Sequence, residues 1–149
     1  MELILLCGIS GSGKTTYRDK HFPDAVLASA DDGMMENGVY VFRGSNLEHA
    51  HGSCFRRVVE SLQSRRPVVV VDNTNITVEA VAPYVTAGEA YGYKVRLLCL
   101  KVDPKIAGPR NTHKVPQVKV EEMAKTFDAF LKNLPRRWKA RVELVPADP

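Results

Sequence analysis

The feature that most constrains this chain is a glycine-rich segment close to its start. Residues 8–15 read Gly-Ile-Ser-Gly-Ser-Gly-Lys-Thr and match the phosphate-binding loop (P-loop) pattern GxxxxGK[ST] in full. An apolar run at residues 2–7 precedes the loop, and a stretch of helical spacing at 14–20 follows it. In that context, successive backbone N–H groups and the start of the helix face one phosphate group. The pattern predicts a nucleotide site, but it does not separate kinases from ATPases or GTPases.

Along the rest of the chain, short apolar runs alternate with longer segments of helical spacing. The runs predict strands at residues 2–7, 25–29, 68–71, 94–102 and 141–145, and the longer segments predict helices at 14–20, 46–64, 78–91 and 116–134. The strands are almost continuously apolar, as strands covered on both faces are. We therefore predict one α/β domain over residues 1–149, with a mostly parallel sheet of about five strands flanked by helices. Residues 31–44 and 102–116 fit neither pattern and are interpreted as loops over the carboxyl ends of the strands, where ligands bind.

Composition and charge limit the class of protein. The chain is 44% hydrophobic and 26% charged, as globular proteins are, and no apolar run reaches the about 20 residues that cross a bilayer. Three cysteines without metal-ligand spacing favour a reducing compartment, so we predict a cytoplasmic protein (the host's cytoplasm if the chain is viral) that does not associate with membranes. Residues 1–93 carry a net charge of −3 and residues 94–149 a net charge of +7. The basic part suits an anionic ligand such as a nucleotide or a nucleic acid, although a lysine-rich solvated surface gives the same bias.

The P-loop residues have distinct expected roles. Lys14 is expected to reach the terminal phosphates of ATP, and the Thr15 hydroxyl is expected to hold Mg²⁺. The residues expected to bind ATP are Gly8, Ser10, Gly11, Ser12, Gly13, Lys14, Thr15 and Thr16, together with Arg110 from the basic segment described below.

Carboxylates and an arginine elsewhere complete a candidate phosphoryl-transfer site. Asp72 ends the apolar run at 68–71, where P-loop enzymes hold the water shell of the metal, although a helix cap or turn is an alternative. Asp31 and Asp32 follow the second predicted strand, where a kinase places the acid that accepts the proton of the acceptor hydroxyl; a turn is the alternative. Arg110 lies in a basic segment before the last long helix and is expected to bridge the transferring phosphoryl oxygens, unless that segment is merely an exposed loop.

Four sequence blocks together resemble the kinase domain of bacteriophage polynucleotide kinase and its P-loop relatives, which include phage kinases of 5-hydroxymethyluracil in DNA. The blocks are residues 8–16, Ser-Ala-Asp-Asp at 29–32, Val-Asp-Asn-Thr-Asn at 71–75, and Arg-Asn at 110–111 followed by Val-Pro at 115–116. They occur in the same order and extend over residues 1 to about 134. The resemblance implies a P-loop kinase domain with a short basic lid at about 103–116.

The same resemblance implies roles for individual residues. Asp31 would be the general base, Arg110 would belong to the lid, and Asp72, or Asn73 beside it, would order the water shell of the metal. Lys14 and Thr15 would bind the cofactors ATP and Mg²⁺. The residues expected on the acceptor side are Asp32, Tyr40, His51, Arg57, Asn73 and Asn75, with an ordinary helix surface as the alternative for His51 and Arg57.

The chain differs from the phage end-kinase at residues expected to bind the acceptor. That enzyme has an arginine directly before its catalytic aspartate and another three residues after it, where this chain has Ala30 and Met34. We therefore predict an ATP-dependent kinase acting on a nucleic-acid hydroxyl, DNA rather than RNA, and favour the hydroxymethyl group of 5-hydroxymethyluracil. A polynucleotide 5′-hydroxyl is the close alternative. A kinase of a nucleoside or metabolite, and a non-catalytic ATP-binding switch, are further alternatives.

Overall fold

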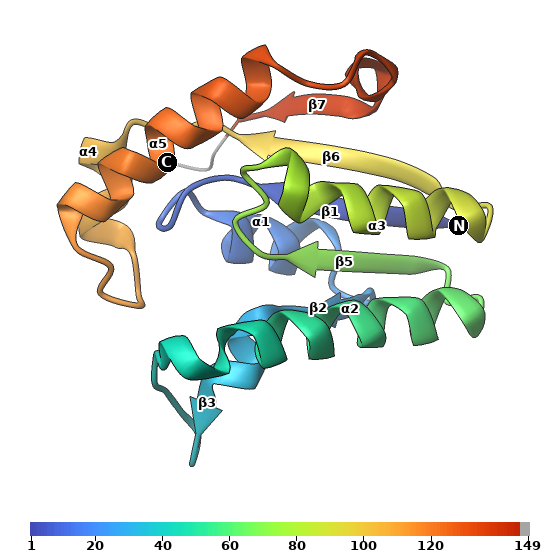
Figure 1. Ribbon diagram of the computed structural model, residues 1–149, viewed down its shortest axis with the longest axis horizontal. Coiled ribbons are helices and arrows are strands. Elements are labelled where there is room, and N and C mark those ends of the chain that lie inside the picture. Colours follow the sequence, from blue (N-terminus) through green and yellow to red (C-terminus); the bar gives the residue numbers. More distant parts are fainter. Residues whose placement is uncertain (147–149) are drawn as a thin grey trace.

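The computed structural model describes residues 1–146 and is built on a parallel sheet of five strands. The strands are β1 (Glu2–Cys7), β2 (Val26–Ala28), β5 (Val68–Asp72), β6 (Lys94–Leu100) and β7 (Val142–Val145). They lie in the order β2-β5-β1-β6-β7, and every neighbouring pair is parallel. The arrowheads of β5, β6 and β7 in Figure 1 accordingly point to the same side of the molecule. The predicted fold class, α/β with a five-stranded parallel sheet, is confirmed.

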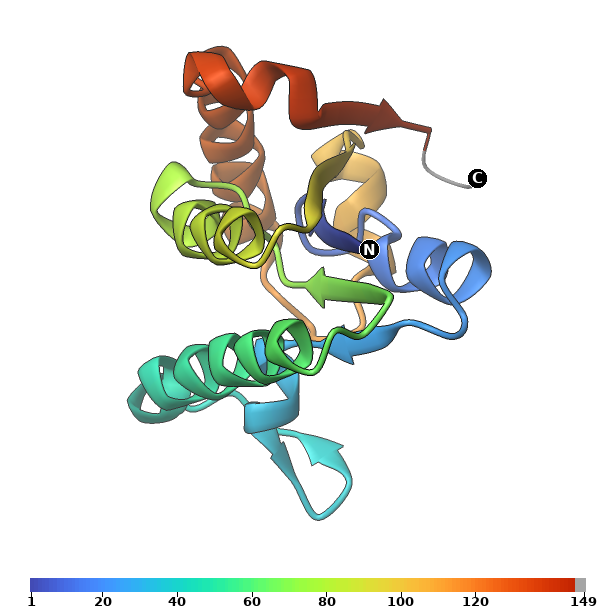
Figure 2. The same ribbon diagram turned by 90° about the vertical axis from the view of Figure 1, so that its right-hand side faces the viewer.

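Helices cover both faces of this sheet. The helices are α1 (Lys14–His21), α2 (Leu47–Gln63), α3 (Val78–Ala90), α4 (Pro104–Arg110) and α5 (Gln117–Lys132), with short 3-10 turns η1 (Ala30–Met34), η2 (Gly44–Asn46) and η3 (Arg136–Arg141). In Figure 2 α2, α3 and α5 lie on one side of the sheet and α1 lies on the other. No helix within residues 1–146 combines the length and apolarity that crossing a membrane requires.

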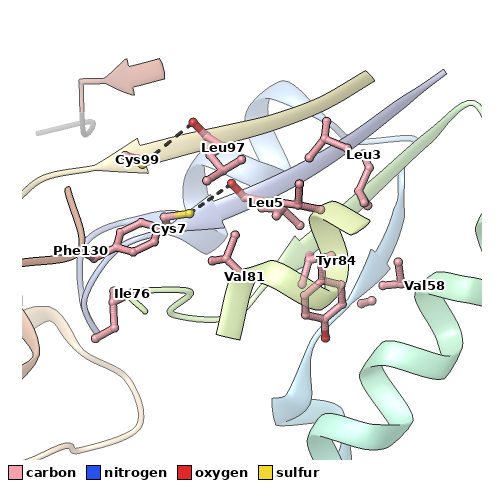
Figure 3. Packing of buried hydrophobic residues seen from close by; sticks show 14 of the residues in the cluster. Leu3, Leu5, Cys7, Val58, Ile76, Val81, Tyr84, Leu97, Cys99 and Phe130 are labelled. Carbon is pink, nitrogen blue, oxygen red and sulfur yellow. Dashed lines mark hydrogen bonds between the residues drawn. The ribbon is translucent and has the colours of Figure 1, made fainter. Parts of the chain in front are cut away.

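The alternation of side chains along the strands explains why the strand sequences are apolar throughout. Leu3 and Leu5 of β1 belong to the larger core, which includes Val58 of α2 and Val81 of α3 (Figure 3). Ile4 and Leu6 of β1 point to the opposite face and belong to a smaller core that includes Tyr17 of α1. Because successive side chains of a strand point to opposite faces, a strand covered on both sides must be apolar at every position.

Two segments interpreted as loops contain regular structure. Within residues 31–44 the chain forms an antiparallel hairpin of β3 (Met35–Glu36) and β4 (Val39–Tyr40). Its turn is Asn37-Gly38, with φ angles of 51° and 80°, which is the residue pair that two-residue hairpin turns favour. Within 102–116 lies helix α4, which Asp103 caps by accepting a hydrogen bond from the Lys105 amide at 2.8 Å. No helix or strand was predicted in these segments, because the short local signals Asn-Gly and Asp-Pro were not recognised; as candidate active-site loops, both segments do line the pocket described below.

Asn75 ties the connection after β5 to the end of β1. Its side chain is buried, and its amide Nδ2 donates to the carbonyl oxygen of Leu6 at 2.8 Å. Its φ of 49° lies in the left-handed region, where asparagine is tolerated better than most residues. The residue therefore holds together two strand ends that border the site described below.

Replacement of Asn75 by Ala is expected to lower the free energy of unfolding by about 2–3 kcal/mol, because it combines a left-handed strain of about 1 kcal/mol with a lost buried hydrogen bond. Asn37→Ala is the matched control, since Asn37 has nearly the same φ but is exposed. It should cost only about the 1 kcal/mol of strain. Urea unfolding of both variants measures the difference, and equal losses would contradict a stabilising role for the Asn75–Leu6 hydrogen bond.

Candidate active site

A pocket of about 420 Å³ opens at the carboxyl edge of the sheet. Six parts of the chain line it: the P-loop and the first residues of α1, η1 with the hairpin around β4, the start of α2, the end of β5, the segment around the end of α4, and α5 through Met123. The lining residues that the sequence predicted as functional are Ser10, Gly11, Ser12, Gly13, Lys14, Thr15, Thr16, Asp31, Tyr40, His51, Asp72, Asn73 and Arg110. The structure thus brings together most of the predicted site, from segments about 100 residues apart in the sequence.

Lys14 occupies the centre of the P-loop. Its Nζ donates to the carbonyl oxygens of Gly8 at 2.9 Å and Ile9 at 2.8 Å, and to Ser12 Oγ at 3.4 Å. Burial lowers the pKa of Lys14 to about 8, although the nearby charge of Asp72 acts in the opposite direction. The ammonium group is therefore held where a phosphate would meet it, and it is poorly hydrated there.

Gly11 is the point at which helix α4 packs onto the P-loop. It has a φ of 80°, and a Cβ atom built at this position would overlap the carbonyl oxygen of Ala107 in α4. Only glycine allows so close an approach of two backbones in this conformation. The packing fixes α4, and with it Arg110 at its end, over the phosphate-binding loop.

Asp72 and Thr15 form the part of the pocket that suits a metal ion. Thr15 Oγ1 donates to Asp72 Oδ2 at 3.1 Å, and Arg18 Nη1 donates to the same oxygen at 3.0 Å. Burial raises the pKa of Asp72, against the opposing charges of Lys14 and Arg18. No cluster of three metal-ligating side chains lies within the described part of the chain. One hydroxyl and one carboxylate are nevertheless what Mg²⁺ uses when phosphates and water supply its other ligands, so the residues fit this ion.

Arg18 is a site residue that sequence reasoning missed. It pairs with Asp72 from the first helix after the P-loop, and its side chain is 19% exposed. The signal was present, because Arg18 lies four residues after Lys14 and neighbours on one helix face are three or four residues apart.

Both polar atoms of the Asn73 side chain are hydrogen-bonded to other parts of the protein. Its Oδ1 accepts from the backbone amide of Ala30 at 2.8 Å, and its Nδ2 donates to Cys54 Sγ at 3.6 Å. Tyr84 donates its hydroxyl to the same sulfur at 3.3 Å. Asn73 therefore attaches the turn that carries Asp31 to helix α2, while Asp72 is the residue beside Thr15.

Asp31 faces the pocket from η1, just after β2. Ser29 caps this turn, its Oγ accepting from the Asp31 backbone amide at 3.1 Å. The Asp31 carboxylate lies 3.2 Å from His113 Nε2. Asp31 is thus fixed through its backbone on one side and through its carboxylate on the other.

Three residues predicted on the acceptor side do not line the pocket. Arg57 donates Nε to the carbonyl oxygen of Leu27 at 2.7 Å and borders a separate depression beside β2. Asn75 is buried against Leu6, and Asp32 is exposed outside the lining. The structure gives these three residues no contact with the pocket, because η1 turns Asp32 outward and α2 carries Arg57 away from the strand ends.

An apolar wall on the hairpin side of the pocket was not predicted. Its members are Met34, Phe42 and Leu47, which flank the predicted Tyr40. Ala30 and Met34 are buried with Ala50 and pack against Tyr40 in a small cluster. The Asn-Gly turn signal would have revealed the hairpin, but the direction of its side chains depends on the packing of η1 against α2.

The lowered pKa of Lys14 predicts a pH dependence of nucleotide binding. A phosphate favours the charged form of the lysine. The ATP affinity should therefore be highest and constant below pH 8, and should fall by up to about tenfold per pH unit as the pH rises above about 8. Calorimetry in buffers of different ionisation enthalpy should detect proton uptake on ATP binding in that range. Lys14→Arg is the control, because its guanidinium stays charged there; equal proton uptake by this variant would contradict the assignment to Lys14.

Comparisons with known proteins identify the family and the fold of the chain. A family model described as an AAA domain matches residues 3–136. The chain is 31% identical over 139 residues to human NEDD4-binding protein 2; the match covers 88% of this chain but only 8% of that protein. This chain therefore corresponds to a small part of that relative.

Solved structures share the fold at low sequence identity. A chain in the structure of the Pnkp1/Rnl/Hen1 RNA repair complex is similar with a TM-score of 0.75 and 16% identity, over 90% of this chain and 46% of that chain. A gluconokinase from Sinorhizobium meliloti 1021 is similar with a TM-score of 0.62 and 15% identity, over 99% and 83% of the two chains. At sequence identities this low, the structural similarity establishes the fold alone. These structures show that the chain has the fold of a P-loop kinase, and the match over residues 3–136 shows that it belongs to the AAA-domain family.

Proposed function

We propose that this chain is an ATP-dependent kinase that transfers the γ-phosphoryl group of ATP to a hydroxyl group on a nucleic acid. The observation that carries this proposal is the presence of Asp31 in the same pocket as the P-loop, Asp72 and Arg110. An ATP-binding switch needs the P-loop, but it has no use for a second carboxylate facing the terminal phosphate. A kinase needs that carboxylate to accept a proton.

The donor side is formed by the P-loop and the end of β5. Backbone N–H groups of the loop bind the phosphates, and Lys14 leaves the carbonyl oxygens of Gly8 and Ile9 to meet the β- and γ-phosphates. Thr15 would hold Mg²⁺ directly and Asp72 would hold it through water. The bound ion would supply positive charge that offsets the charge of the phosphates.

The transfer step uses groups on both sides of the phosphate. Asp31 accepts the proton of the attacking hydroxyl while the new O–P bond forms and the bond to the β-phosphate oxygen breaks. Arg110, in the lid proposed at residues 103–116, stabilises the charge on the transferring oxygens. The remaining catalytic requirement is orientation, which the packing of α4 on Gly11 supports.

The acceptor side favours a substrate that carries an aromatic base. Phe42 lines the pocket and is 63% exposed, so its ring is available for a base to stack on. The net charge of +7 over residues 94–149 suits a polyanion. Ala30 and Met34 are packed in an apolar cluster, so they offer no grip on a phosphate beside the acceptor.

These features lead us to favour the hydroxymethyl group of a flipped 5-hydroxymethyluracil in DNA over a 5′-hydroxyl end. The 5′-end kinase remains the second candidate, supported by the fold shared with a chain of an RNA repair complex. A metabolite kinase is a third candidate, since a gluconokinase also shares the fold.

An acceptor panel with γ-labelled ATP separates these candidates. The acceptors are duplex DNA with 5-hydroxymethyluracil, the same duplex with thymine, 5′-hydroxyl and 5′-phosphorylated strands of DNA and RNA, and a mixture of nucleosides with gluconate. We expect label on the hydroxymethyluracil duplex and none on the thymine duplex. The Michaelis constant for DNA should rise steeply with salt, because binding releases counterions.

Each other outcome has a defined meaning. Label on 5′-hydroxyl but not 5′-phosphorylated strands would replace the base acceptor by the strand end. Label confined to the small molecules would overturn the nucleic-acid proposal. ATP binding without label on any acceptor would overturn the kinase proposal in favour of a switch.

A further inference from the structure

We propose that His113 is a positioning residue for phosphoryl transfer, holding the Asp31 carboxylate in its working orientation from the lid. This inference rests on the proposed role of Asp31 as the general base. It adds a residue to the acceptor side that neither the P-loop motif nor the carboxylate positions indicate.

Two contacts fix the imidazole of His113. Its Nε2 lies 3.2 Å from Asp31 Oδ2, and its ring packs on Tyr40 with the centroids 3.9 Å apart and an angle of 37° between the planes. Asp31 comes from η1, Tyr40 from β4, and His113 from the connection between α4 and α5. The His113 side chain therefore connects the lid both to η1, through Asp31, and to β4, through Tyr40.

The loop that carries His113 is closed by Asn111. Asn111 Nδ2 donates to the carbonyl oxygens of Gly108 at 2.7 Å and Val115 at 3.1 Å, and its Oδ1 accepts from the Val115 amide at 2.7 Å. Lys114 adopts a φ of 56°, an uncommon conformation for a residue other than glycine. A strained turn with bonds across its base holds His113 in one place, as functional residues on loops often require.

Both ends of this lid segment are also attached. At one end α4 packs on Gly11 of the P-loop, and at the other Gln117 Nε2 donates to the carbonyl oxygen of Pro104 at 3.0 Å. The position of His113 relative to Asp31 therefore follows from the position of the whole lid on the phosphate-binding loop.

In the contact between His113 and Asp31, the two carboxylate oxygens of Asp31 have separate roles. His113 donates Nε2–H to Oδ2, both as the imidazolium and as the neutral tautomer with the proton on Nε2. Oδ1 is then the oxygen that takes the proton from the acceptor hydroxyl, as the new O–P bond forms and the bond to the β-phosphate breaks. Burial, with a smaller effect of the Asp31 charge, raises the pKa of Tyr40, so the phenol stays neutral and acts as a packing surface for the imidazole.

The kinetic test compares His113→Ala with His113→Gln on the acceptor that the panel identifies. In His113→Ala we expect kcat to fall by about 10- to 100-fold, as misplacement of a reacting group does, with the Michaelis constant for ATP unchanged. His113→Gln should recover most of kcat, because the glutamine amide can donate to the carboxylate. Lys119→Ala, at an exposed position of α5 that does not line the pocket, is the control and should keep the wild-type kcat.

A second measurement does not require activity. In the ¹H–¹⁵N spectrum of the imidazole groups, His113 should carry its proton on Nε2, and Asp31→Ala should shift that resonance, whereas Asp32→Ala should not. Upfield ring-current shifts of the His113 carbon-bound protons should disappear in Tyr40→Ala.

The two measurements distinguish failure of this inference from failure of the proposed function. Wild-type transfer with an unchanged kcat in His113→Ala would overturn the positioning role, as would a His113 resonance indifferent to Asp31→Ala. A wild-type chain that labels no acceptor would contradict the proposed function and the positioning role with it, while the spectra would still establish whether the His113–Asp31 contact exists.

Discussion

The half-buried ammonium group of Lys14 makes the contacts on which the rest of the site depends. Taking a charge out of water costs several kcal/mol unless other groups compensate it. Here two loop carbonyls, the Ser12 hydroxyl and the nearby Asp72 carboxylate provide that compensation. The loop must curl around Lys14 to do so, as a phosphate-binding loop does. A polyphosphate bound by the loop would satisfy both the ammonium and the backbone N–H groups of the loop.

The order of the strands explains how the other groups are distributed around this centre. Strand β5 is the direct neighbour of β1, so Asp72 at its end lies beside Thr15 just after the P-loop. Strand β2 is one position further out, so the turn with Asp31 lies beyond Asp72, and Asn73 bridges the gap by binding the Ala30 amide. Donor-side and acceptor-side groups thus occupy successive strand ends, and the segment from α4 to α5 lies over both.

Much of this arrangement could be predicted from the sequence, because it depends on local patterns. The P-loop motif and the continuous apolar strands determine the sheet, and they place Asp72 and Asp31 at its carboxyl edge. Arg57 shows where the resemblance misled: it lies six residues after His51 on α2, a rise of about 9 Å, and its Nε donates to the carbonyl oxygen of Leu27 outside the pocket. His113 could not be distinguished from its basic neighbours, since its importance depends on the hairpin that brings Tyr40 to it. Asn73 and Asp72 differ in role only through their partners in the folded chain.

The claim that Asp31 turns a nucleotide-binding pocket into a kinase site is tested most directly by Asp31→Asn, with Asp32→Asn as the matched control. The measurement is ATP binding by calorimetry alongside transfer of labelled phosphate to the preferred acceptor. The account predicts that Asp31→Asn keeps its ATP affinity within about twofold while the transfer rate falls by at least about 100-fold, the usual effect of losing a general base. Asp32→Asn should transfer at nearly the wild-type rate. Transfer by Asp31→Asn at the wild-type rate would contradict the account.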